Sequence, residues 1–147
     1  MAGSSGNEFI AGVSAVSIAS VLGRHGDLKR ALRSFRDVVD RWRRTGNWMQ
    51  QWTTLRNLGD LFVRLGEDEL AALFHGATVR DEDVASVYGP EAARLERARR
   101  LLDERLGTAS LRTLLTRGRL MTGEDCIALA AREIDRLLDA TTAAMAP

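Results

Sequence analysis

Apolar residues recur along this chain at spacings of three and four, which is the period of an amphipathic α-helix. The pattern is clearest between residues 28 and 45. Its apolar positions there are Leu28, Ala31, Leu32, Phe35, Val38, Val39 and Trp42. The spacing predicts a helix over 28–45 that is buried along this one stripe. Asp27 is suited to cap the start of the helix and Gly46 to end it.

The same period predicts six further helices. They fall at about 7–22, 48–65, 67–78, 90–106, 109–117 and 123–140. Asn47, with Gln50 at the reciprocal position, is typical of a helix start, and so is the pair Thr122 and Asp125. The polar segment 79–89 ends in Gly89-Pro90 and is predicted to be the longest loop.

Three glycines that are predicted to end helices follow one another at a regular interval. Gly26, Gly66 and Gly107 lie 40 and 41 residues apart, and periods of this size are typical of stacked helical hairpins. The first two units also match internally, because Ala31 and Ala71 each follow their glycine by five residues. We therefore predict an all-α fold of antiparallel hairpins, stacked as a short solenoid of about seven helices.

The order of residues around these glycines resembles the tetratricopeptide repeat. In that order, a leucine and a small residue are followed by a large residue, the turn glycine and an alanine. The period here is longer than the usual repeat, and His75 stands where the second repeat expects an aromatic residue. The segment Asp40–Leu58, with Leu65-Gly66, Tyr88-Gly89 and Leu106-Gly107, is similar to the C-terminal helical-repeat region of actinobacterial LuxR-type and adenylate-cyclase-linked ATPase regulators. That resemblance implies a sensor or scaffold segment that follows an ATPase module.

The predicted domain organisation is one helical-repeat domain over 7–140, with a flexible leader at 1–6 and a frayed tail at 141–147. No phosphate-binding motif or DNA-reading domain is recognisable in the sequence. We therefore expect either a fragment of such a regulator or a free-standing relative. The start lacks the features of a signal peptide, and no run of about 18 apolar residues is present, so we expect a cytoplasmic protein without a membrane span.

Composition narrows the chemistry further. The formal net charge of +1 argues against a generally basic nucleic-acid binder. The single cysteine, Cys126, excludes an internal disulfide and a cysteine-rich zinc site, and we expect it to pack as a small apolar side chain. His25 and His75 lie 50 residues apart without a ligand set around them, and His75 is expected to pack in the core. We expect no enzyme activity, no cofactor and no bound metal.

The remaining candidates are partner-binding residues. The helix at 28–45 is rich in arginine, and three tryptophans cluster near its end, of which Trp48 is expected to be the most exposed. The candidate partner-binding residues are Arg33, Arg36, Arg43, Arg44 and Trp48. They favour a non-catalytic interaction or scaffold module of a signalling or transcriptional regulator, whose partner is a protein or peptide, another domain of the same regulator or a second copy. The alternative is a nucleic-acid-binding helical domain that uses the basic helix 28–45.

Overall fold

The structure is a computed structural model that describes residues 27–78 and 90–145. Side chains are described for residues 27–78 and 92–140. The regular elements in these ranges are six α-helices, without a strand, which confirms the predicted all-α class. The helix predicted at 7–22 and the loop predicted at 79–89 lie outside the described residues. The solenoid stacking and the count of about seven helices therefore stay predictions.

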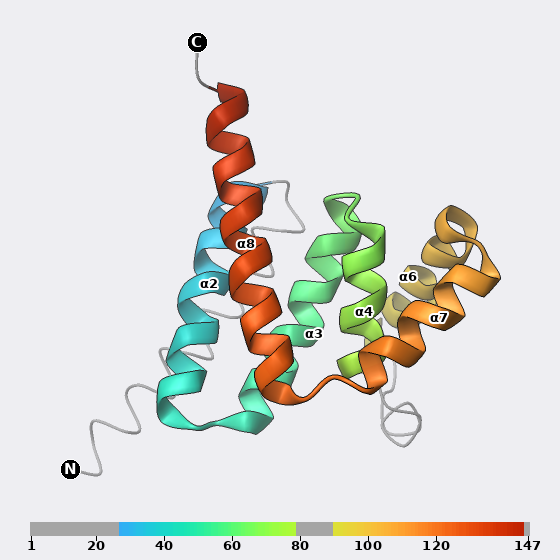
Figure 1. Ribbon diagram of the computed structural model, residues 1–147, viewed down its shortest axis with the longest axis horizontal. Helices are drawn as coiled ribbons and strands as arrows, with labels where there is room; N and C mark the ends of the chain where they lie inside the picture. The colour runs from blue at the N-terminus through green and yellow to red at the C-terminus, as the bar shows by residue number, and fades with distance from the viewer. Residues whose placement is uncertain (1–26, 79–89, 146–147) are drawn as a thin grey trace. The chain divides into compact units, whose positions relative to one another are not determined.

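The described helices begin and end close to the predicted positions (Figure 1). They are α2 (Leu28–Thr45), α3 (Trp48–Arg64), α4 (Asp68–Thr78), α6 (Pro90–Leu106), α7 (Thr108–Arg119) and α8 (Gly123–Met145). None of the helices described here is long and apolar enough to cross a membrane.

Three helix ends depend on glycine, as predicted for Gly46, Gly66 and Gly107. Their φ angles are 69°, 77° and 86°, in the left-handed region that costs glycine little. Gly26, the first glycine of the predicted series, lies outside the described residues.

Two of the three predicted caps are present. Asn47 Oδ1 accepts the backbone N–H of Gln50 at 3.2 Å. Thr122 and Asp125 each accept the other's backbone N–H, both at 3.1 Å. The prediction for Asp27 was wrong in its detail, because Asp27 stands at the N-cap of α2 but its side chain accepts no capping hydrogen bond. Its ψ of 69° departs from the extended backbone of a capping residue, and its carboxylate lies 3.5 Å from Arg30 instead.

The described residues group into two compact units. The first unit contains 27–55 and 127–145, and the second contains 56–78 and 90–126. The prediction of a single domain over 7–140 stays a prediction.

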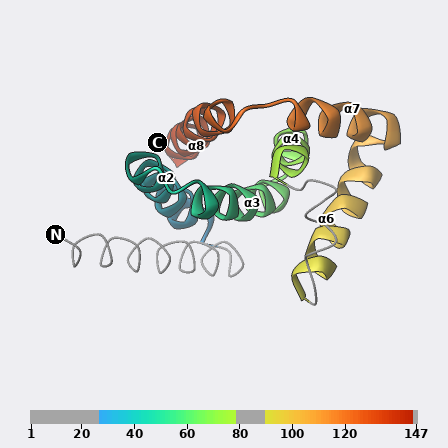
Figure 2. The same cartoon turned by 90° about the horizontal axis from the view of Figure 1, so that it is seen from below.

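In the first unit, α2 and α8 run side by side in both views (Figures 1 and 2). The predicted stripe of α2 is buried from Ala31 to Trp42, whereas Leu28 is half-buried. Gln51 on α3 is also buried, and its side-chain Nε2 donates to the Val39 carbonyl of α2 at 3.0 Å. This hydrogen bond joins α3 to α2 and pairs the buried amide nitrogen, which would cost free energy if it were left without an acceptor.

In the second unit, α4 packs most extensively against α7. The two helices cross where each has a glycine, Gly76 on α4 and Gly118 on α7. A Cβ built at Gly76 would overlap the Leu115 carbonyl oxygen and lie 2.8 Å from the Leu115 Cα. A Cβ at Gly118 would overlap the Leu73 carbonyl oxygen and lie 3.0 Å from the Ala77 nitrogen. The two backbones therefore approach as closely as they do only because both positions lack a side chain.

Replacing either crossing glycine by alanine tests this packing. Helix propensity alone predicts that Gly→Ala inside a helix stabilises by about 1 kcal/mol. We expect G76A and G118A to destabilise instead, by about 2 kcal/mol, because the new methyl group meets backbone that cannot move aside easily. The free energy of unfolding in urea measures the effect.

Gly59 on α3 provides the matched control. A Cβ there would lie 3.4 Å from the Phe74 Cβ, an ordinary van der Waals contact. We therefore expect G59A to be neutral or slightly stabilising. The close crossing of α4 and α7 would be contradicted if G76A and G118A were as stable as G59A.

Candidate functional site

Three of the predicted partner-binding residues come together where α2 ends and α3 begins. Arg43 and Arg44 are exposed in the last turn of α2, and Trp48, the first residue of α3, is 39% exposed. The next residue, Met49, is 79% exposed and was not singled out in the sequence. We call Arg43, Arg44, Trp48 and Met49 the corner surface.

The corner surface is fixed by the backbone of the turn. Gly46 adopts the left-handed conformation, and the Asn47 N–H donates to the Trp42 carbonyl at 3.1 Å. Trp42 itself is buried at the end of the α2 stripe. The Trp48 ring lies against the Trp52 ring, with centroids 6.2 Å apart and the planes tilted by 40°. Trp48 is thus held on one side by an aromatic neighbour while part of its ring faces solvent.

The two other predicted residues lie elsewhere on α2. Arg33 is exposed but stands ten residues before Arg43, which is roughly 15 Å along a helix axis. Arg36 is half-buried and forms ion pairs with Asp40 at 2.7 Å and with Asp135 of α8 at 3.2 Å. Its guanidinium therefore helps to attach α8 to α2, and it is not part of the corner surface.

A groove beside the corner carries charges of both signs. It is lined by Asp37, Asp40, Arg41, Arg43 and Arg44. Arg43 and Arg44 form no ion pair with any described residue, whereas Asp40 is held by Arg36. The part of the groove lined by Arg43 and Arg44 is therefore its positive part.

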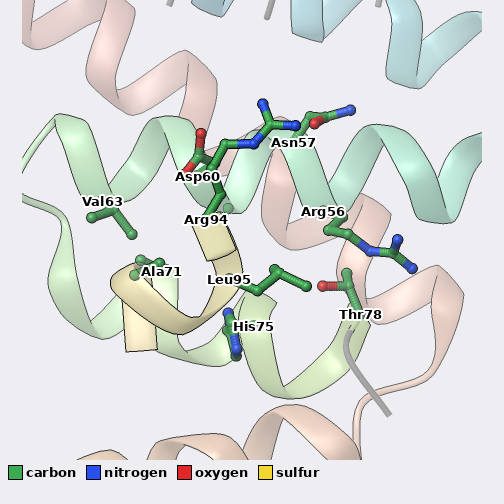
Figure 3. A pocket seen from close by; sticks show the side chains of 11 residues that line it. Arg56, Asn57, Asp60, Val63, Ala71, His75, Thr78, Arg94 and Leu95 are labelled. Carbon is green, nitrogen blue, oxygen red and sulfur yellow. The ribbon is translucent and has the colours of Figure 1, made fainter. Parts of the chain in front are cut away.

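A second candidate site lies within the second unit, in a cavity that the sequence reasoning did not predict (Figure 3). We call it the α4 cavity, and its empty volume, counted out to the solvent at its mouth, is about 540 Å³. The polar residues that line it are Arg56, Asn57, Asp60, His75, Thr78 and Arg94. The other lining residues are Gly59, Val63, Ala71, Leu95 and Ala98. They come from α3, α4 and α6.

His75 is the most buried titratable group of the α4 cavity, with 9% of its surface exposed. Burial, together with the positive charges of Arg99 and Arg56, lowers its pKa to about 4. The imidazole is therefore neutral at pH 7. The sequence predicted that His75 is buried, which is confirmed, but not that it faces polar neighbours.

The sequence did contain a signal for this cavity. Arg56, Asn57 and Asp60 interrupt the apolar residues of α3. Polar residues at such positions are normally assigned to a solvated face. Only the packing of α4 and α6 shows that they are half-buried together.

Cys126 is the other candidate for chemistry among the described residues. Cys126 is fully buried, and burial together with the nearby charge of Asp125 raises the pKa of its thiol to about 11. The thiolate, which is the reactive form, is therefore disfavoured. The part of the chain that is described contains no group of three or more residues placed to hold a metal ion. His25 lies outside it.

The burial of His75 predicts how stability depends on pH. The folded protein favours the neutral imidazole. Below pH 6.5 the imidazole is protonated in the unfolded chain but not in the folded protein, which lowers the free energy of unfolding. This loss of stability grows as the pH falls, until the pKa of the folded state near 4 is reached. At pH 5 the loss amounts to about 2 kcal/mol relative to pH 7.5. Urea unfolding of the wild type and of H75Q at both pH values measures it.

The carboxylates titrate in both proteins, so the comparison isolates His75. We expect the wild type to lose more stability between pH 7.5 and pH 5 than H75Q does. Equal losses would show that the imidazole is not buried in its neutral form.

The comparisons with known proteins supply no relative for this chain. No family model matches it, and neither does any curated protein or any solved structure. The function is therefore argued from the geometry of the corner surface and the α4 cavity.

Proposed function

We propose that the chain is a non-catalytic protein-interaction module of a signalling or transcriptional regulator, and that the corner surface is its docking site. The observation that carries the proposal is the exposure of two large apolar side chains, Trp48 and Met49, directly beside Arg43 and Arg44, cations that pair with no described residue. The resemblance of the segment Asp40–Leu58 to regulator repeat regions supports the biological context.

The apolar half of the surface provides the affinity. Tryptophan is enriched among the residues that dominate binding energy, since it buries a large rigid area at a small entropic cost. Trp48 is already ordered by its contact with Trp52, so a partner loses little by fixing it further. Met49 adds a flexible apolar side chain that adapts to the partner.

The charged half of the surface defines the partner. Arg43 and Arg44 lie in the last turn of α2, where the helix dipole favours positive charge, and neither is neutralised by a described carboxylate. Complementary charge speeds association and excludes partners of like charge. The occupant is therefore an acidic protein segment with interspersed apolar side chains, such as a peptide or another domain of the same regulator.

A synthetic peptide of alternating glutamate and leucine tests the proposal, with a lysine–leucine peptide as the charge control. We expect the acidic peptide to bind and to quench or shift the fluorescence of Trp48. W48A and R44E should each weaken binding by about tenfold, which corresponds to about 1.4 kcal/mol. Isothermal titration calorimetry gives the affinities.

R33E is the matched control for R44E. Both substitutions reverse an exposed arginine of α2, but Arg33 lies outside the corner surface. The proposal requires R33E to bind nearly as well as the wild type. It fails if the acidic peptide does not bind, or if R33E and R44E weaken binding equally.

The alternative ligand is a nucleic acid, which would bind through the basic helix 28–45. Duplex DNA at low salt serves as the probe. Binding that weakens steeply with salt, and that is lost equally with R33E and R44E, would favour this alternative over peptide docking.

A further inference from the structure

We infer that the α4 cavity binds a small organic carboxylate, through Arg94, Asn57 and His75. The inference concerns the second unit alone and does not depend on the corner surface. It rests on three features of the described residues in and around the cavity: polar groups without partners, a positive balance of charge, and an apolar wall.

The polar groups come from three different helices. Asn57 lies on α3, His75 on α4 and Arg94 on α6. None of these three side chains forms a hydrogen bond or ion pair with a described residue. Three polar side chains from three helices that line one cavity, without a partner among the described residues, leave their hydrogen-bonding groups open to a ligand.

The charges in and around the cavity favour an anion. Arg56 and Arg94 line it, and Arg99 on α6 is close enough to His75 to lower the pKa of the imidazole. The buried Nε of Arg99 has no hydrogen-bond acceptor among the described residues. The acidic lining residue, Asp60, faces the cation Arg64 at 3.9 Å. Among the described residues, an entering anion therefore meets more positive than negative charge.

The rest of the wall favours an organic anion over inorganic phosphate. Val63, Ala71, Leu95 and Ala98 form an apolar part of the lining that suits a short hydrocarbon body. In the view of Figure 3 the Leu95 side chain lies below Arg94, Asn57 and Asp60 and above His75. A carboxylate at the end of that hydrocarbon body matches the planar guanidinium of an arginine, which can donate two parallel hydrogen bonds to it.

Butyrate is the probe, and its neutral isostere butyramide is the matched ligand control. Both are titrated into the protein while the imidazole resonances of His75 are followed by NMR. We expect butyrate to bind with a Kd of about 1 mM or tighter and to shift the His75 resonances. Butyramide should leave them unchanged.

Three variants test the named residues. R94Q removes the proposed guanidinium contact and should weaken butyrate binding at least tenfold. R97Q, on the same helix but exposed and outside the cavity lining, is its matched control and should bind like the wild type. N57D adds a negative charge at the cavity and should abolish binding. Circular dichroism melts show whether each variant is folded.

The outcomes separate clearly. Binding of butyrate that is lost in R94Q and N57D but kept in R97Q supports the inference. It is overturned if butyrate does not bind, if butyramide binds equally well, or if inorganic phosphate binds and butyrate does not. Equal weakening by R94Q and R97Q would also overturn it, because attraction would then be a general surface effect.

Discussion

The close approach of α4 to α7 is the constraint on which the second unit depends. Gly76 and Gly118 allow the backbones to touch, so one face of the short helix α4 is occupied by α7. Ala71, His75 and Thr78 follow one another at helical spacing on the opposite side, and all three line the α4 cavity. The crossing thus determines both how α4 is oriented and which of its side chains a ligand would meet.

The two candidate sites differ in how they use charge. At the corner surface, Arg43 and Arg44 remain in water, where charges cost little and act mainly on the rate and specificity of association. In the α4 cavity, Arg56, Arg94 and Asn57 are half-buried and His75 is buried. A polar group in that environment interacts more strongly with a ligand, because less water competes for it.

The local features of the fold could be predicted from the sequence. The helix ends at Gly46, Gly66 and Gly107, the Asn47 cap and the stripe of α2 depend on residues that are close together in the chain, and the structure contains these features. Asp27 shows the limit of such reasoning. Its residue type is suited to an N-cap, but its backbone conformation is not that of a capping residue.

Features that depend on distant residues could not be predicted in this way. Nothing near Arg36 indicates its ion pair with Asp135, which lies 99 positions later. In the sequence, Gly76 and Gly118 are simply glycines that lower helix propensity. Their role is visible only in the structure, where the two helices cross at them. The α4 cavity was missed for the same reason, since its three walls come from separate segments. Trp48 could be predicted to be exposed, because its exposure follows from its place at the start of a helix and does not depend on distant residues.

The position of the single cysteine gives the chain a built-in reporter. Cys126 is fully shielded at the beginning of α8, and its thiol holds its proton firmly at neutral pH. An alkylating reagent can modify it only in molecules where this part of the helix has opened. The speed of modification, relative to that of the unfolded chain, therefore measures the free energy of that local opening without any added label.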